Sequence, residues 1–289
     1  MRWLVGVDLR SSDGALRLAA WLARTAREPQ AFVGVHVIEE DDLRAVLRFR
    51  HLEEVIAEAR DAVGQVLERA GASGLLESVE VVGGGRAEDR LEELRGARAC
   101  DAILIGRLAK RGAHPLVRLG RVARRLLRRH PAPVLIAPPD FDAAQLGSGP
   151  VVALTRLTLD SAAALRFARL LADGLGRPLA ALHVIPDPMR AAAYGLGRDQ
   201  LDDLRRQATD SAERELGAWL DEAGIQVDER AVAVGEVVDQ ANAAADRAGA
   251  PVLVAGSRRA PGVEALVAVS LGRELAATAR LPIALVPPV

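Results

Sequence analysis

Residues 101–107 read DAILIGR and residues 251–258 read PVLVAGSR, which places Gly106 and Gly256 150 positions apart. Two other pairs of segments repeat in the same order: VHVIEED at 35–41 with LHVIPDP at 182–188, and APVLIAPP at 132–139 with LPIALVPP at 281–288. Matches in one order at nearly one offset indicate a tandem duplication. We therefore predict two domains, 1–139 and 151–289, joined by a Pro-, Gly- and Ser-rich linker at 140–150.

Within each half, short runs of Val, Ile and Leu alternate with longer stretches of helical period. This alternation is typical of successive βαβ units and a parallel sheet, whose strands are buried on both faces. The predicted strands lie near 3–8, 31–37, 78–82, 101–106 and 133–137, and near 151–155, 179–185, 227–234, 251–256 and 282–287. The predicted fold class is α/β, with a five-stranded parallel sheet and four helices on its two faces in each half.

Composition excludes several classes of function. Aromatic residues make up 3% of the chain and its net charge is -1, so neither a base-stacking platform nor a uniformly basic nucleic-acid surface is expected. No apolar run reaches the roughly 20 residues of a membrane span, and the apolar start before Asp8 is too short for a signal peptide. The single cysteine, Cys100, precedes an apolar run and is expected to be buried and reduced. These features predict a cytoplasmic protein that binds neither membranes nor nucleic acid.

Several segments in order resemble the universal stress protein family: VGVDLRSS at the start, VHVI at the second strand, GRAEDRL before the third helix, DAILIGR, and HPAPVLIAP at the end. The resemblance covers the chain twice and implies a tandem universal stress protein with two Rossmann-like domains of the adenine nucleotide alpha hydrolase type. It also implies that the last strands of the two halves pair, as an internal pseudo-dimer, with a homodimer of the whole chain as a further candidate assembly. ATP is the cofactor that the resemblance implies.

In the family, ATP phosphates are held by a loop of pattern G-x2-G-x9-G-[S/T] after the fourth strand, and an Asp after the first strand contacts the nucleoside. An open parallel sheet binds ligands at the carboxyl ends of its strands, where strand order reverses. If the first and fourth strands are neighbours there, Asp8 and the loop at Gly106 face one crevice. The candidate site of the first half is Asp8, Val37, Gly106, Gly120 and Arg121, holding ATP or a related anion.

Both halves depart from the phosphate-loop pattern. In the first half Ala109 replaces the second glycine, ten residues instead of nine precede Gly120, and Arg121 stands at the hydroxyl position. The second half departs further, because Thr155 stands where the first half has Asp8. It also has Arg259 at the second-glycine position, Gly272 lying 16 residues after Gly256, and Arg273 at the hydroxyl position.

Two interpretations of Arg121 and Arg273 stay open. Either the guanidinium binds phosphate in place of the hydroxyl, or the bulky side chain covers the crevice and nucleotide binding is lost. The basic residues that follow Arg121 are predicted to be mostly the solvated face of an amphipathic helix, with polyanion binding as the alternative. Any nucleotide binding is expected in the first half alone.

Other chemistry is sparse in this sequence. Ser11 or Ser12 is expected to cap the first helix, and the acidic patch from Glu39 to Asp42 is expected to be surface that opens the second helix. His36 and His183 have no partner at metal-ligand spacing, and neither a G-x-S-x-G elbow nor a G-x-x-x-x-G-K-[ST] loop is present. We therefore expect no catalytic residues and no metal site. The leading hypothesis is a non-enzymatic stress-response protein acting through assembly or partner contacts, and the alternative is a nucleotide sensor that uses its first domain.

Overall fold

The computed structural model describes residues 1–9, 11–107, 119–129, 132–188, 197–257, 272 and 274–288. Its ten strands form one continuous sheet in the order β3-β2-β1-β4-β5-β10-β9-β6-β7-β8. The strands of the first half are β1 (Arg2–Gly6), β2 (Ala31–Ile38), β3 (Ser78–Gly83), β4 (Ala102–Gly106) and β5 (Val134–Ala137). Those of the second half are β6 (Val151–Thr155), β7 (Leu179–Ile185), β8 (Glu229–Val234), β9 (Leu253–Gly256) and β10 (Ile283–Val286). All ten predicted strands are present.

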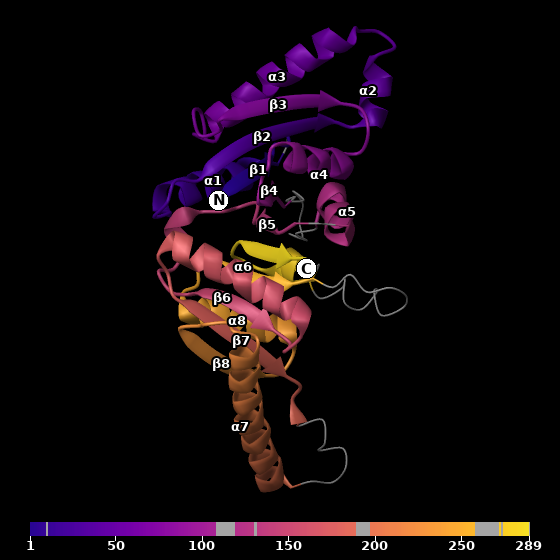
Figure 1. The fold of residues 1–289 in the computed structure, drawn as a ribbon. Helices are drawn as coiled ribbons and strands as arrows, with labels where there is room; N and C mark the ends of the chain where they lie inside the picture. The colour runs from indigo at the N-terminus through magenta and orange to yellow at the C-terminus, as the bar shows by residue number, and fades with distance from the viewer. Residues whose placement is uncertain are drawn as a thin grey trace.

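The two halves meet edge to edge at the centre of this sheet (Figure 1). Every strand pair within a half is parallel, whereas β5 and β10 pair antiparallel, with Ile136 opposite Ile283 and Val134 opposite Leu285. Two five-stranded parallel sheets are thus fused into one, and the predicted pairing of the last strands is present within a single chain. By pairing, β5 and β10 satisfy each other's backbone N–H and C=O groups, which would otherwise be unpaired at a sheet edge.

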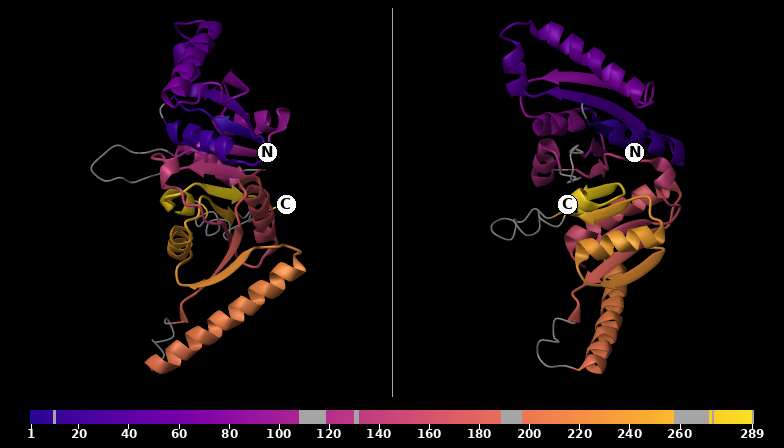
Figure 2. Two further views of the ribbon diagram at one scale, coloured as in Figure 1. Left: turned by 90° about the vertical axis from the view of Figure 1, so that its left-hand side faces the viewer. Right: turned by 180° about the vertical axis from the view of Figure 1, so that it is seen from behind.

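Helices cover both faces of the sheet (Figure 2). The first half contains α1 (Asp13–Thr25), α2 (Glu40–Val46), α3 (Leu52–Arg69), α4 (Ala87–Ala97) and α5 (Arg121–Arg129). The second half contains α6 (Leu159–Leu175), α7 (Arg198–Glu222), α8 (Val237–Ala248) and a last helical segment at 274–278; a short 3-10 helix, η1 (Ala143–Gln145), lies between the halves. α7 extends well beyond the sheet in both figures.

Alternate residues of each strand enter two different cores, one on each face of the sheet. Trp3 and Val5 of β1 belong to a core that also includes residues of α1, α3, α6 and α7, whereas Leu4 belongs to the core of the opposite face, with residues of α4, α5, α8 and the segment 274–278. This alternation follows from the period of two in a strand. Each core includes residues from both halves, so the hydrophobic interior continues across the β5–β10 junction.

The second helix predicted for the first half is two helices in the structure, which corrects the expectation of four per half. α2 ends at Val46, and α3 begins after His51, whose backbone N–H donates to the Glu54 carboxylate at 3.4 Å. A carboxylate three residues into a helix that accepts from the N-cap amide is half of a capping box. That start signal separates α3 from α2.

Arg107, directly after β4, connects the two halves. Its guanidinium donates to the carbonyl oxygens of Ala276 at 2.7 Å and Ala279 at 2.8 Å, at the last helical segment of the second half. The side chain is buried, and burial lowers the pKa of Arg107 below the usual range of a guanidinium, against the opposing effect of Asp140. The Arg107 guanidinium lies at the C-terminus of the helical segment 274–278, whose free carbonyl groups favour a positive charge.

The segment between the halves is packed against the second half. Phe141 is buried in the core, and the backbone N–H of Gly149 donates to the carbonyl of Gly249 at 2.9 Å. A Cβ at Gly147 would lie 1.9 Å from the same carbonyl oxygen. Glycine at this position therefore permits close backbone contact, in addition to any flexibility that the composition indicates.

Candidate functional site

β1 and β4 are neighbours, and strand order reverses between them, as the proposed crevice requires. A cavity of about 660 Å³ lies at the carboxyl ends of these strands. Its lining includes all five residues that the sequence analysis selected, namely Asp8, Val37, Gly106, Gly120 and Arg121. The structure therefore brings together residues spread over more than 110 positions of the chain.

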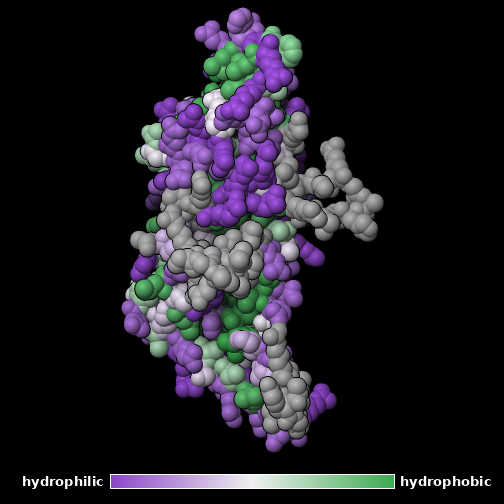
Figure 3. Space-filling model, turned by 90° about the vertical axis from the view of Figure 1, so that its right-hand side faces the viewer, coloured by the Kyte–Doolittle hydropathy of each residue, from purple (hydrophilic) through white to green (hydrophobic). Residues whose placement is uncertain are grey.

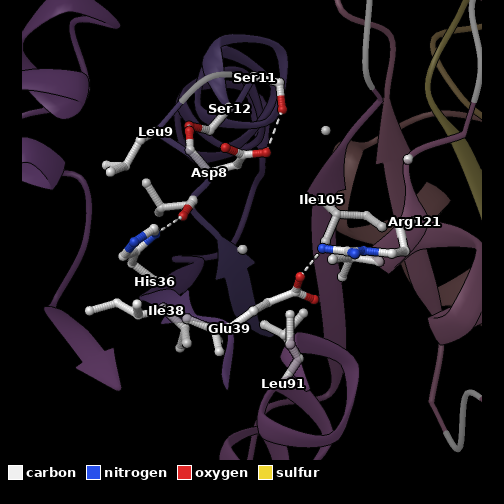
Figure 4. A pocket seen from close by; sticks show the side chains of 18 of the residues that line it. Asp8, Leu9, Ser11, Ser12, His36, Ile38, Glu39, Leu91, Ile105 and Arg121 are labelled. Atoms are coloured by element: carbon white, nitrogen blue, oxygen red, sulfur yellow. Dashed lines mark hydrogen bonds and ion pairs between the residues drawn. The ribbon is translucent and has the colours of Figure 1, made fainter. Parts of the chain in front are cut away.

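Asp8 is held by the two serines that follow it (Figure 4). The Ser11 hydroxyl donates to the Asp8 carboxylate at 2.9 Å, and the Ser12 hydroxyl donates to the Asp8 backbone carbonyl. Ser12 is the N-cap residue of α1, but its side chain makes no hydrogen bond to the first-turn amides. The predicted N-cap position is thus confirmed for Ser12, but the predicted hydrogen bond from its hydroxyl to the first-turn amides is wrong, because both hydroxyls donate to Asp8 at the cavity instead.

His36 is fixed by the backbone of the neighbouring strand end. Its Nδ1 lies 2.8 Å from the carbonyl oxygen of Val7, and the equivalent His183 lies 3.0 Å from the carbonyl of Thr155. Because a carbonyl can only accept, Nδ1 carries the hydrogen in both rings. The repeated histidine therefore has a structural role in each half, joining the end of the second strand to the end of the first.

Gly106 and Gly256 are required by close packing of the first helix of each half. A Cβ at Gly106 would lie 2.7 Å from the carbonyl oxygen of Ser11, and one at Gly256 would lie 3.0 Å from that of Asp160. The same absence of a side chain leaves room for a ligand near β4. Gly106 is therefore explained by the close approach of the chain at the start of α1, whether or not a phosphate binds.

Arg121 forms an ion pair with Glu39, which comes from the end of β2 and lies 82 residues away in the sequence. Figure 4 shows the two side chains meeting across the cavity from Asp8. The Arg121 side chain is 58% exposed, whereas that of Glu39 is 17% exposed. Glu39 Oε1 is buried and no residue in the described part of the chain hydrogen-bonds to it. Glu39 is therefore part of the cavity, which corrects the interpretation of this residue as surface. Glu40, Asp41 and Asp42 are exposed at the start of α2 as expected, although Asp42 also lines the cavity.

The basic residues of α5 have a structural explanation. Ala123, Leu126 and Leu127 are buried beneath the helix, Arg124 is exposed, and Arg125 lies 3.5 Å from the buried carboxylate of Glu88. Figure 3 shows a hydrophilic surface over α4 and α5. The arrangement agrees with the solvated face of an amphipathic helix. The loop position Ala109 lies outside the described residues.

The second half differs at the position equivalent to Asp8. The Thr155 side chain is buried, and its hydroxyl accepts a hydrogen bond from the backbone N–H of Leu157 at 3.0 Å. Leu157 has a positive φ of 57°, so this bond supports a strained turn rather than a ligand. Arg259 and Arg273 lie outside the described residues.

The sequence analysis missed two residues that matter here, Glu39 and Arg107. Glu39 belongs to a run of four acidic residues that resembles an exposed helix start, and only the fold brings it to Arg121. The sequence does offer a signal for Arg107. It is a charged residue directly after a buried strand, whereas the equivalent position in the second half is the uncharged Ser257. The described residues include no group of three or more His, Cys, Asp or Glu side chains that could hold a metal ion. No helix in the described ranges is long and apolar enough to cross a membrane.

Comparison with known proteins agrees with the repeat. The profile of the universal stress protein family matches residues 1–138 and again residues 150–287. A universal stress protein of Archaeoglobus fulgidus DSM 4304 superimposes with a TM-score of 0.68 at 19% identity, covering 100% of this chain and 98% of that one. A Pseudomonas aeruginosa UCBPP-PA14 structure described as the same kind of protein gives a TM-score of 0.62 at 15% identity, covering 99% and 93%. At such identities the likeness shows the fold alone. A search of curated protein sequences finds no match.

Proposed function

This chain belongs to the universal stress protein family, and on that premise we propose that it is a non-enzymatic stress-response protein that binds one adenine nucleoside or nucleotide per chain. The observation that carries the proposal is the cavity of the first half, where Asp8, Val37, Gly106, Gly120 and Arg121 meet at the strand-order reversal. Apolar residues of β2 and β4 supply walls for a base, and Asp8 supplies a carboxylate for its amino group or for ribose hydroxyls.

The side chains around the cavity support binding rather than catalysis. The hydroxyls of Ser11 and Ser12 donate to atoms of Asp8, and the Nδ1 of His36 donates to the backbone of Val7. A serine nucleophile needs a base within hydrogen-bond reach, and neither hydroxyl is directed at the histidine. We therefore assign no catalytic role to these residues.

One ligand per chain is expected because the two halves differ at the key acid. Thr155 replaces Asp8 in the second half, and its hydroxyl is engaged in a local turn. Losing a hydrogen-bonding partner of this kind costs about 1–3 kcal/mol, which is roughly a 5- to 150-fold loss in affinity. The first half is therefore the proposed site.

Titration calorimetry with adenosine and with ATP tests this assignment. We expect at most one ligand per chain, with affinity lowered about 5- to 150-fold in Asp8→Ala and kept in Thr155→Ala, and thermal melts should show that both variants fold. Two equivalent sites, or native affinity in Asp8→Ala, would contradict the proposal.

A second candidate is a nucleotide-independent role in assembly or partner contacts. The Glu39–Arg121 ion pair favours it, because this pair already occupies the arginine that a phosphate would use. Absence of both ligands in the calorimetry would support this candidate over the first.

A further inference from the structure

The charges around the cavity are unfavourable for a polyphosphate. Among the described residues that line it, Asp8, Glu39 and Asp42 carry carboxylates and Arg121 alone carries a permanent positive charge. With three carboxylates and one guanidinium, the described part of the cavity lining carries a net negative charge. ATP carries several negative charges, which such a lining repels at close range.

Glu39 occupies the one guanidinium that faces the cavity in the described part of the lining. Its Oε2 accepts from Arg121 Nη2, and the ion pair lies across the cavity from Asp8 (Figure 4). A charge-assisted hydrogen bond between a guanidinium and a carboxylate is of the same kind as one between a guanidinium and a phosphate. Glu39 therefore makes, from within the chain, the contact that Arg121 would offer to a phosphate.

The start of α5 would ordinarily favour an anion, since Gly120, Arg121, Val122 and Ala123 line the cavity and the first amides of a helix lack partners within it. Glu39 already brings a carboxylate to the first residue of this helix. A phosphate that takes over Arg121 Nη2 displaces a carboxylate that is only 17% exposed, and a phosphate that binds another N–H of the guanidinium lies close to that carboxylate. Unpairing a largely buried charge opposes phosphate binding.

The remaining polar groups suit a ligand rich in hydrogen-bond donors. Glu39 Oε1 is buried and has no hydrogen-bond partner among the residues that the structure describes, and a carboxylate oxygen can only accept. The Asp8 carboxylate lies on the opposite side of the cavity. Ribose hydroxyls and an adenine amino group donate hydrogen bonds, whereas a fully ionised phosphate has none to donate.

We propose that Glu39 acts as an internal substitute for phosphate, so that the cavity of the first half selects an uncharged adenine nucleoside over ATP. This inference rests on the proposed function and makes its ligand class specific. Glu39 is a specificity-determining residue in this scheme, and Arg121 is the group for which Glu39 and a phosphate compete.

The test is calorimetry of the full chain with adenosine and with ATP, each without added metal, in the native protein, Glu39→Gln and Glu40→Gln. Glu40 is the matched control: it is the adjacent acid, it is half-exposed, and its ion pair is with Arg44 on α2 instead of a cavity residue. The native protein should bind adenosine at least as tightly as ATP. Glu39→Gln should shift the ratio of ATP to adenosine affinity about tenfold toward ATP, whereas Glu40→Gln should leave this ratio at its native value.

Arg121→Ala in the Glu39→Gln background provides an independent measurement. The double variant should lose the gain in ATP affinity of Glu39→Gln, because the guanidinium for which Glu39 and a phosphate compete is then absent. Native protein that prefers ATP tenfold or more, or a Glu39→Gln variant with the native ratio of affinities, would overturn the inference while leaving the proposed function intact. Absence of binding by both ligands would instead remove the proposed function, and the inference with it.

Discussion

Replacing Arg107 by Met should destabilise the whole chain, because this side chain ties β4 of the first half to the last helical segment of the second. Methionine keeps an unbranched stem of comparable length and removes the guanidinium. The two bonds to Ala276 and Ala279, at 2.7 and 2.8 Å, would be lost, and two carbonyl groups in a buried setting would lose a donor. Hydrogen bonds that involve a charged group contribute about 1.5–3 kcal/mol each, which gives about 3–6 kcal/mol in favour of the arginine.

The burial of the guanidinium opposes this contribution. Burial lowers the pKa of Arg107, and its Nε is buried with no partner within the described ranges, so these residues compensate the cation incompletely for the loss of water. Subtracting a desolvation cost of a few kcal/mol leaves an expected loss of about 2 kcal/mol for Arg107→Met. For a chain of this size such a loss lowers the melting temperature by roughly 4–8 °C.

Urea unfolding followed by circular dichroism, together with calorimetric melting, measures this loss. Arg124→Met is the matched control, since it makes the same substitution at an exposed arginine of α5 and should change stability by less than about 0.5 kcal/mol. If Arg107→Met unfolds at the same urea concentration as Arg124→Met, the connection between the halves does not contribute to stability and the reasoning fails.

Three further results are expected. Residues 1–140 expressed alone should form homodimers or aggregates in light scattering, because the β5 edge loses its partner; a well-behaved monomer would contradict this. Burial raises the pKa of the Cys100 thiol, so a thiol reagent should modify the folded protein far more slowly than the urea-unfolded protein, and equal rates would show that the thiol is accessible. The backbone N–H of Leu179 and then Arg169 lower the pKa of Asp228, so its stabilising contribution is complete above the pKa of an unfolded aspartate and is lost as pH falls through the lowered value. Asp228→Asn should therefore be less stable than the native protein at pH 7, with a difference that shrinks in acid; a difference independent of pH would refute this.

The strands could be predicted from the sequence because each is a short apolar run that recurs in the second half. Strands buried on both faces need such runs, and the repeat provides a second, independent reading of every element. The division between α2 and α3 was missed because it depends on a capping interaction between His51 and Glu54, within a stretch of helical period.

The candidate site could be predicted only in part. Asp8 and Gly106 follow neighbouring strands, so strand order alone places them together. The ion pair between Glu39 and Arg121 joins the end of β2 to the start of α5, and no local sequence pattern predicts this pairing. The serines near Asp8 were placed correctly at the start of α1, yet the direction of their hydrogen bonds depends on backbone geometry that residue types do not encode.

The antiparallel contact of β5 with β10 has a genetic consequence. In an assembly of two identical subunits, every codon change appears on both sides of the symmetry axis, so a buried cation introduced on one side must be accommodated twice. Here one reading frame encodes both sides, and each can accumulate its own substitutions. Arg107 facing the second half, with Ser257 at the equivalent position, is such a one-sided change. Covalent fusion thus allows the two copies of the fold to diverge in sequence independently of each other.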